Sequence, residues 1–448
     1  MKKVFGLSNF KKAYRYCRKN GIVPAFWAAL ERIAGGDTTY EKRFLSAAEL
    51  EMQRDAVWDK RELFSVLVPA YETDVRHFHE MIDSVQAQTY GNWELIIADA
   101  SPSDKLRREM GYYKDSRIRY LRLKENRGIS ENTNAALAAA AGGYIGLLDH
   151  DDVLEPDALY RMMETIQGVV RETGIAPQVL YSDEDKCDET GQYYYEPNIK
   201  SNFNFDFLLS NNYICHFLLM KAELIKELGL RPAYDGAQDY DLILRAVGRL
   251  QEKEIVHVGR ILYHWRCHAL STAANPASKL YAYEAGKRAV QDFLREKGIE
   301  GQAVDTEHVG FYRIVYEPDI FAAREDVGML GGSVTDRDHK RSSGILLKNG
   351  LCPFAGLYSF FSGPANVAAV GRDAYALDAR AVLLRKEDIP LFEEIMKVPY
   401  VEEIEKRDRQ YCNRLDENIW KQRSMALCAV FRERGQRLVW DPKIRVRR

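Results

Sequence analysis

The sequence lacks paired cysteines, a long apolar run and a strong excess of charge. Its seven cysteines are scattered over 448 residues and form no CxxC pair, which excludes a disulfide framework and a structural zinc site of that type. The net charge is −2, from 64 basic and 66 acidic residues, whereas a general nucleic-acid binder carries a basic excess. The longest apolar run, residues 135–148, is too short to span a bilayer, and no secretory signal is visible. We therefore expect a cytoplasmic protein, soluble or peripheral on the inner face of the plasma membrane.

The first 60 residues carry many positive charges, with no acid before Glu31. These charges are Lys2, Lys3, Lys11, Lys12, Arg15, Arg18 and Lys19. A basic amphipathic helix within residues 1–33 predicts docking to an anionic membrane surface. The alternative is a helical arm that packs on the rest of the chain and leaves its basic face in solvent. In either case, residues 1–60 are expected to form a separate helical segment.

The pattern then changes to alternating strands and helices. Short apolar runs at residues 64–70, 93–98, 117–123 and 144–148 predict strands, and helical patterns lie between them at residues 74–88, from about 102, and at 130–141. This order predicts an α/β domain over residues 61–314, with a mainly parallel, doubly wound, Rossmann-like sheet. Residues 315–448 are expected to form a further α/β module.

Candidate ligand residues follow the end of each predicted strand. They are Pro69, Tyr71 and Glu72 after the first strand, Asp99 after the second, Asn126, Arg127 and Gly128 after the third, and Asp149 and Asp151 after the fourth. Ligands of open α/β sheets bind beyond the carboxyl ends of the strands. We therefore expect these residues to form one site.

The acidic turn after residues 144–148 predicts a metal site. Asp149, Asp151 and Asp152 follow five apolar residues directly, and carboxylates this close repel one another unless a cation lies among them. Oxygen ligands favour Mg²⁺ or Mn²⁺, and Mg²⁺ commonly bridges carboxylates to phosphate oxygens. The alternative is a solvated turn in which Asp149 or Asp152 caps a helix that begins near Pro156.

Together, these segments resemble the family 2 glycosyltransferases, which have the GT-A fold. The resemblance covers residues 64–270 and rests on motifs in the family's order: VLVPAYE at 66–72, NRGIS at 126–130 with Asn134, LDHDD at 148–152, YSDED at 181–185, NNY at 211–213, GAQDYD at 236–241 and YHWR at 263–266. The likeness is to bacterial polysaccharide enzymes, rhamnosyltransferase-like ones among them. It implies an inverting, metal-dependent transfer of a sugar from a UDP- or dTDP-linked donor to a lipid-linked or growing surface glycan, without nucleic-acid partners. A homodimer stays open.

The resemblance also implies roles for individual residues. The nucleotide-sugar would contact Pro69, Tyr71, Glu72, Asp99, Asn126, Gly128, Asn134, Asp149 and His150; Mn²⁺ or Mg²⁺ would be held by Asp149, Asp151 and His264; the general base would be Asp239; and the acceptor would contact Asp183, Glu184, Asp185 and Gln238. Here Asp99 would accept a hydrogen bond from a pyrimidine N–H. His268 is an alternative to His264 as a metal ligand.

Some of these roles have plainer alternatives, and two positions depart from the family pattern. Asp239 would also serve as the N-cap of a helix over residues 240–250, and residues 183–185 would also suit a solvated turn. The family usually has Glu where Gln238 stands, which leaves the choice of acceptor open. Thr133 replaces an arginine that is common before Asn134, which leaves the nucleotide contacts less defined.

The C-terminal module resembles the second half of a family 2 domain. Residues 426–442 resemble the helix that carries the base and the strand after it, and residues 326–335 and 367–385 resemble the two preceding segments. The catalytic carboxylates would then be replaced by Ser424 and Ala426, and the half that holds the metal motif would be missing. We interpret residues 315–448 as a truncated, non-catalytic remnant. The alternative is an unrelated α/β tail.

Two other functions fit parts of the sequence. Asp149-x-Asp151-x-Val153 after an apolar strand also matches the nucleophile motif of haloacid-dehalogenase phosphatases, but that fold usually carries its motif on the first strand. The second is a non-catalytic glycan-binding or scaffold protein derived from a glycosyltransferase. The intact Asp149, Asp151 and Asp239 argue against it.

Overall fold

The computed structural model describes residues 17–18, 21–34, 40–267 and 280–448. The chain forms two compact units. Within the described ranges, the central unit comprises residues 40–203 and 212–298, and the C-terminal unit comprises residues 204–211 and 299–448 together with the described residues up to 34. The sequence placed residues 204–211 and 299–314 in the α/β domain. They group instead with the C-terminal unit because α8 (Phe205–Ser210) packs on the hairpin strand β11 (Tyr312–Tyr316).

The central unit is built on one nine-stranded sheet, with strand order β3-β2-β1-β4-β8-β6-β9-β5 and β7 beside β6. Four neighbouring strands are parallel: β3 (Ile118–Arg122), β2 (Trp93–Asp99), β1 (Phe64–Ala70) and β4 (Tyr144–Leu147). The remaining strands are β5 (Val153–Leu154), β6 (Val179–Asp188), β7 (Tyr194–Asn198), β8 (Leu218–Lys221) and β9 (Ile255–Cys267). Of these, β8 runs antiparallel to β4 and β6, and β9 runs parallel to β6. The predicted mainly parallel α/β sheet is confirmed.

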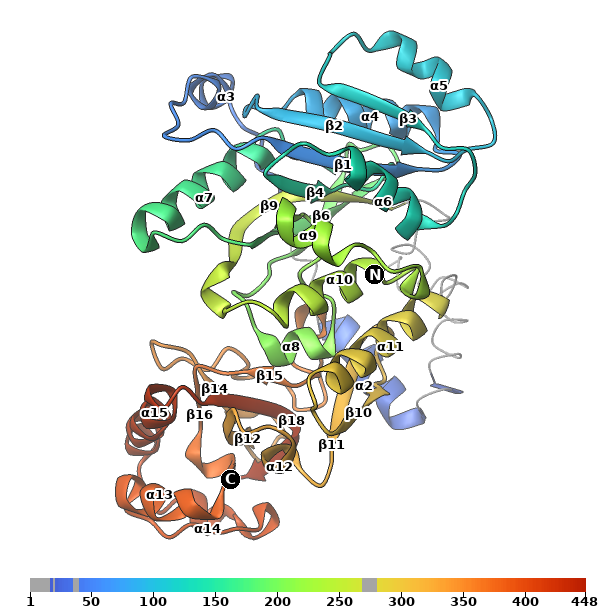
Figure 1. Cartoon of the computed structure of the whole chain (residues 1–448). Coiled ribbons are helices and arrows are strands. Elements are labelled where there is room, and N and C mark those ends of the chain that lie inside the picture. Colours follow the sequence, from blue (N-terminus) through green and yellow to red (C-terminus); the bar gives the residue numbers. More distant parts are fainter. Residues whose placement is uncertain (1–16, 19–20, 35–39, 268–279) are drawn as a thin grey trace. The chain divides into compact units, whose positions relative to one another are not determined.

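Helices cover both faces of this sheet (Figure 1). The helices of the central unit are α3 (Ala47–Arg54), α4 (Val75–Gln86), α5 (Lys105–Glu109), α6 (Ile129–Ala139), α7 (Ala158–Thr173), α9 (Ala222–Leu228), α10 (Gln238–Val247) and α11 (Leu280–Glu296), of which α4, α6, α7 and α9 pack directly on the sheet. Helix α4 buries Phe78, Met81, Ile82 and Val85, which recur at helical spacing, and Asp74 caps it. These side chains share a core cluster with Val66 of β1. Strands β1, β2 and β4 read as nearly continuous apolar runs because both of their faces are covered, whereas the edge strand β3 is only half-buried.

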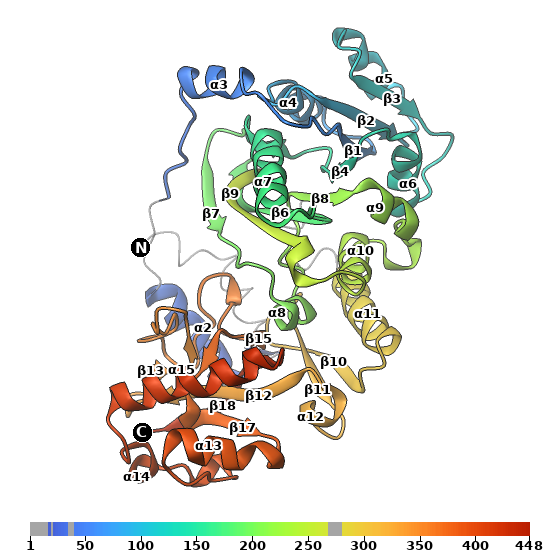
Figure 2. The same cartoon turned by 60° about the vertical axis from the view of Figure 1, so that its left-hand side comes forward.

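The C-terminal unit has its own sheet and core. Its sheet has the order β13-β12-β18-β15, with β17 beside β12. Its elements are α2 (Ile22–Ala34), α8, β10 (Gly301–Asp305), β11, α12 (Ile320–Ala323), β12 (Val327–Thr335), β13 (Arg341–Ser343), β14 (Ile345–Leu346), β15 (Arg372–Asp373), β16 (Ala376–Leu377), β17 (Val382–Leu384), α13 (Ile389–Met396), α14 (Arg409–Cys412), α15 (Glu417–Glu433) and β18 (Arg437–Arg447). Trp420, Phe431 and Trp440 are fully buried in its main core cluster. Figure 2 shows α15 lying along this sheet.

The two units share one pattern of strand pairing. In the central unit, β6 is parallel to β9 and antiparallel to β7 and β8, and α10 precedes β9. In the C-terminal unit, β12 is parallel to β18 and antiparallel to β13 and β17, and α15 precedes β18. Ser424, in the middle of α15, is fully buried and its Oγ accepts a hydrogen bond from the Ala379 amide at 2.9 Å.

The predicted basic amphipathic helix falls largely outside the described residues. Helix α2 is described, and its Ile22 and Phe26 side chains are exposed. Within the described ranges, none of the helices combines the length and the apolar character that crossing a membrane requires.

Candidate active site

Strand β4 leads into the acidic turn. Tyr144, Ile145 and Gly146 are buried, and a side chain at Gly146 would collide with the ring of Phe217, the residue just before β8, because an added Cβ would lie 2.8 Å from it. The strand therefore packs closely against β8 and ends at Leu147. The Asp149 side chain that follows is 45% exposed. The carboxylates that follow β4 are thus held at the sheet edge where ligands of α/β folds bind.

Asp152 does not share this exposure. Its Oδ2 accepts a hydrogen bond from the Tyr263 hydroxyl at 2.5 Å, and its Oδ1 accepts one from the Arg266 amide at 2.7 Å. Burial, and then the charges of Asp151 and Asp149, raise the pKa of Asp152 well above its ordinary value. Asp152 ties the turn to β9 and caps no helix, since α7 begins only at Ala158. The helix-cap interpretation of the acidic turn is therefore wrong for Asp152.

Asp149 and Asp151 suit a divalent cation. Partial withdrawal from water raises the pKa of Asp149, and the negative charges of Asp151 and Asp239 raise it further. A cation bound here would relieve that repulsion. His150 lies between them in the chain, with its Nδ1 3.8 Å from Asp151 Oδ1. Carboxylate oxygens are the donor set that Mg²⁺ and Mn²⁺ prefer, so these residues fit the ion that the sequence predicts.

Asp239 lies in the first turn of α10 and faces the same site. The helix begins at Gln238 with Ala237 at the N-cap position, so Asp239 is already helical and is not the cap. Its Oδ2 accepts a hydrogen bond from Asn212 Nδ2 at 2.9 Å. One ligand atom from each of Cys215, His216 and Asp239 lies within 4.8 Å of the other two. The Asp239 carboxylate is therefore available to a bound molecule at this edge.

His216 is a site residue that the sequence reasoning missed. Its Nε2 lies 4.0 Å from Asp149 Oδ2 and its Nδ1 lies 3.4 Å from Glu184 Oε2, while its ring stacks on Tyr263 with centroids 4.8 Å apart. Burial opposes protonation, but contacts with Glu184, Asp149 and Asp239 raise the pKa of His216 to about 9. His216 is therefore a cation at neutral pH. The signal available in the sequence was its position five residues after Asn211, where the NNY motif begins.

His264 lies on the other side of β9 from this site. Adjacent residues of a strand point to opposite faces, and Tyr263 points to Asp152. The His264 Nδ1 lies 2.5 Å from Asp185 Oδ1, and its Nε2 lies 2.7 Å from Glu155 Oε2 and 3.0 Å from Lys42 Nζ. The structure therefore does not bring His264 together with Asp149 and Asp151. The alternative ligand, His268, lies outside the described residues.

The predicted acceptor residues on β6 are buried and paired. Asp183 Oδ1 accepts hydrogen bonds from the Lys200 amide and pairs with His257 Nε2, both at 2.8 Å. Burial by itself would raise the pKa of Glu184, but Lys200 and His216 lower it to about 2. Asp185 accepts a hydrogen bond from the Tyr40 hydroxyl at 2.7 Å. Of these three residues, Glu184 borders the site through its contact with His216. Partners within the protein account for all three buried carboxylates, so their burial does not require a bound acceptor.

Gln238 is the fourth predicted acceptor residue, and it adjoins Asp239 in α10. It is partly exposed, and its Oε1 accepts a hydrogen bond from the Gly236 amide at 2.8 Å. Its side chain thereby closes the turn before the helix.

The residues predicted for the base and ribose lie at the ends of β1 and β2. Asp99 is fully buried, and its Oδ2 accepts hydrogen bonds from the Tyr120 hydroxyl at 2.5 Å and from Arg122 Nη1 at 2.8 Å. Tyr71 is 48% exposed, Glu72 is exposed, and Pro69 is partly buried beside them. The exposed side chains of Tyr71 and Glu72 are thus accessible to a ligand, whereas the Asp99 carboxylate already accepts hydrogen bonds from Tyr120 and Arg122.

The NRGIS segment forms the N-terminus of α6. Asn126 Oδ1 accepts hydrogen bonds from the Gly128 amide at 3.0 Å and from Asn132 Nδ2 at 2.9 Å. Gly128 has a φ of +95°, and a Cβ there would lie 2.2 Å from Asp235 Oδ2. Asn134 instead holds the Leu230 backbone, because its Nδ2 donates to Leu230 O at 2.8 Å and its Oδ1 accepts from Leu230 N at 2.9 Å.

Comparison with known proteins bears on the segment that carries this site. Residues 65–229 match the sequence profile of "Glycosyl transferase family 2". "Uncharacterized protein y4gI" of Sinorhizobium fredii (strain NBRC 101917 / NGR234) is 40% identical over 236 residues, which are 52% of this chain and 25% of that protein. "O-antigen biosynthesis protein RfbC" of Myxococcus xanthus is 32% identical over 263 residues, 57% of this chain and 20% of that protein. The chain thus covers a quarter or less of the length of these two relatives.

A solved structure is also similar. The crystal structure of S. aureus TarS 1–349 in complex with UDP aligns over 52% of this chain and 65% of that chain, with 19% identity and a TM-score of 0.39.

Proposed function

The chain contains a family 2 glycosyltransferase domain of GT-A fold, and we propose that it transfers a sugar from a UDP- or dTDP-linked donor to a hydroxyl group of a lipid-linked or growing surface glycan. The observation that carries the proposal is that carboxylates from two elements border His216: Asp149, which follows β4, lies 4.0 Å from its Nε2, and Asp239 in α10 has an oxygen within 4.8 Å of one of its ring nitrogens. The charges of Asp151 and Asp239 both raise the pKa of Asp149. This supports a single site in which Asp149 and Asp151 would bind a cation and Asp239 would remain for proton transfer.

Asp149 and Asp151 would hold Mn²⁺ or Mg²⁺ in this proposal. Such an ion neutralises the charge that develops on a departing diphosphate. The exposed Tyr71 and Glu72 at the end of β1 would border the base and ribose of the donor. His216, as a cation beside Asp149, would keep the carboxylates of the turn ionised and oriented.

Asp239 would act as the general base. An acceptor hydroxyl attacks the anomeric carbon from the face opposite the departing nucleotide, and Asp239 would take its proton as the new bond forms. Asn212 donates a hydrogen bond to one carboxylate oxygen at 2.9 Å and so would fix the orientation of the base. With one base and no covalent intermediate, the configuration at the anomeric carbon would be inverted.

The C-terminal unit would be a second, non-catalytic copy of half the family fold. The shared pairing pattern of β6–β9 and of β12, β13, β17 and β18 supports this interpretation. In this copy, Ser424 would occupy the position of a catalytic carboxylate. Its Oγ instead accepts a buried structural hydrogen bond. We further propose that residues 1–33 contact the inner face of the plasma membrane and that two chains form a homodimer.

Calorimetric titration of UDP, dTDP and GDP, with and without Mn²⁺, tests the proposed site. We expect one pyrimidine diphosphate to bind more tightly with Mn²⁺, and Asp151→Asn to remove that gain. Asp59→Asn is the control, because Asp59 pairs with Arg171 on the surface. If no diphosphate binds in the presence of metal, a non-catalytic scaffold becomes the better interpretation.

A further inference from the structure

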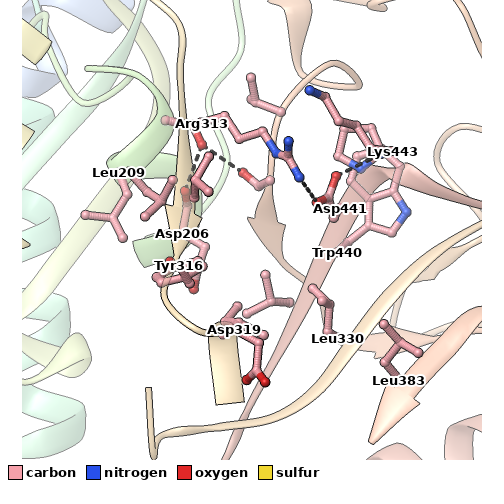
Figure 3. A pocket seen from close by; sticks show the side chains of 18 of the residues that line it. Asp206, Leu209, Arg313, Tyr316, Asp319, Leu330, Leu383, Trp440, Asp441 and Lys443 are labelled. Atoms are coloured by element: carbon pink, nitrogen blue, oxygen red, sulfur yellow. Dashed lines mark hydrogen bonds and ion pairs between the residues drawn. The ribbon is translucent and has the colours of Figure 1, made fainter. Parts of the chain in front are cut away.

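The C-terminal unit contains a cavity of its own (Figure 3). Its volume is about 810 Å³, and every residue that lines it belongs to this unit. Elements α8, β11, α12, β12, β17 and β18 contribute to the walls. Sites for small ligands have volumes of roughly 300–1,000 Å³, so the cavity has room for a small organic molecule.

Apolar and aromatic side chains form two facing walls. Figure 3 shows Leu209 and Tyr316 on one side and Leu330, Leu383 and Trp440 on the other. Aromatic rings offer wide, rigid apolar surface to a flat ligand. These walls suit a ligand with apolar faces.

The polar lining is mostly acidic. It comprises the carboxylates of Asp206, Asp305, Glu307, Asp319, Glu402 and Asp441, against the two cations Arg313 and Lys443. Arg313 is already paired with Asp441 at 3.3 Å. An excess of negative charge repels phosphates and other anions, so nucleotides and sugar phosphates do not suit this cavity. The lining instead offers many hydrogen-bond acceptors to a ligand rich in donors.

Asp206 provides the most specific of these acceptors. Its side chain is 5% exposed, and its Oδ1 accepts a hydrogen bond from Arg324 Nη1 at 2.8 Å. Its Oδ2 is buried and takes no hydrogen bond from any residue that the structure describes. Buried polar atoms are nearly always paired, because an unpaired one costs about 1–3 kcal/mol. Burial, together with the negative charge of Asp373, raises the pKa of Asp206 to about 6 against the effect of Arg324.

We propose that this cavity binds an uncharged sugar residue through its hydroxyl groups. Hydroxyls would donate to the carboxylates that line the cavity, Asp206 among them, and hydrogen bonds to charged acceptors are about twice as strong as neutral ones. The C–H faces of the ring would lie against Tyr316, Leu330 and Trp440. The cavity shares no residue with the transferase site, so this binding does not depend on the proposed activity.

The test is binding of neutral sugars to the full chain. Saturation-transfer NMR and calorimetry with glucose, galactose, rhamnose and N-acetylglucosamine, without nucleotide or metal, should detect at least one of them. Asp206→Asn should weaken that binding by about tenfold or more, the loss expected for one charge-assisted hydrogen bond. Asp151→Asn should leave it unchanged, which separates this cavity from the donor site.

Asp326→Asn is the matched control. Asp326 also pairs with Arg324, with Oδ1 2.9 Å from its Nε, but it does not line the cavity. It should therefore keep sugar binding.

Leu383→Trp gives an independent readout if Asp206→Asn fails to fold. Leu383 is partly exposed to the cavity, so an indole there should fill it and abolish binding. The proposal is overturned if no neutral sugar binds, or if both variants bind as the wild type does. It is equally overturned if glucose 6-phosphate or spermidine binds in the cavity in preference to the neutral sugars.

Discussion

His216 Nε2 lies 4.0 Å from Asp149 Oδ2, which links the acidic turn after β4 to the segment that leads into β8. The contact follows from strand pairing. Leu147 of β4 pairs with Leu218 of the antiparallel strand β8, so the residue two positions after Leu147 meets the residue two positions before Leu218. The same segment carries Asn212, which holds Asp239. One short stretch of chain therefore positions both the proposed metal-binding acids and the proposed base.

Asp239→Asn should reduce turnover while leaving the donor bound. The amide keeps the size of the side chain and its place beside Asn212 but cannot accept a proton, and general-base catalysis contributes about 10²–10⁴-fold. We expect kcat for nucleoside diphosphate release to fall by at least about 100-fold, with nucleotide affinity within threefold of wild type. Glu223→Gln, an exposed acid in the first turn of α9, is the control. Wild-type turnover in Asp239→Asn would assign the base to another residue.

The raised pKa of His216 predicts that stability falls above neutral pH. Its pKa is about 9 in the folded protein against 6.5 ordinarily, so the folded state binds the proton more tightly. The resulting stabilisation is complete below pH 6.5 and is lost as the pH rises through 9, and it amounts to about 3 kcal/mol. Urea unfolding in EDTA between pH 6 and 9.5 measures it. His216→Gln should lack this decline, and His79→Gln should retain it.

Gly128→Ala should destabilise the central unit. The residue has a φ of +95°, and an added Cβ would lie 2.2 Å from Asp235 Oδ2, so backbone strain adds to a collision. We expect a loss of about 2–4 kcal/mol in urea unfolding. Removing the carboxylate with Asp235→Ala should recover the part due to the collision. Gly111→Ala, which has open space around it, should change stability little.

His264→Ala separates a structural role from a metal-binding one. Its ring lies between Asp185 and Glu155, beside Lys42, and its removal leaves buried polar groups without a partner. We expect a loss of about 2–4 kcal/mol in the free energy of unfolding and an unchanged affinity for Mn²⁺, measured by calorimetry at a temperature where the variant is folded. Normal stability together with lost Mn²⁺ binding would restore His264 as the third metal ligand.

Strands and helices of the central unit were predictable where hydrophobic periodicity is strong. The predicted strand at 64–70 is β1, the strand at 144–148 is β4 with one residue fewer, and the helix at 74–88 is α4 with Asp74 as its cap. These segments bury regular apolar faces, so their pattern alone defines them. The start of α6 was not predictable in this way. The helix predicted at 130–141 begins instead at Ile129, and the Ser130 amide donates to Asp235, 105 residues away.

The candidate site was predictable where its residues belong to motifs that are continuous in the sequence. Asp149, Asp151 and Asp239 belong to recognisable motifs, and His216 does not, because its role arises from the antiparallel pairing of β8 with β4. Likewise, the face of the sheet to which the His264 side chain points depends on the register of β9 with β5 and β6. A one-residue change in that register would reverse which of Tyr263 and His264 points to the acidic turn. Tertiary pairing therefore decided the residues that local pattern left open.

The eight residues at 204–211 interrupt the central unit in sequence and belong to the C-terminal unit in space. Asn204 exchanges hydrogen bonds with Asp373, at 2.9 Å in both directions, and Asp206 pairs with Arg324. No single cut in the chain can therefore separate the two units. Ending the chain at residue 298 would strip α8 of these partners, and replacing residues 299–448 with an unrelated module would do the same. The two units are therefore not exchangeable parts of the chain.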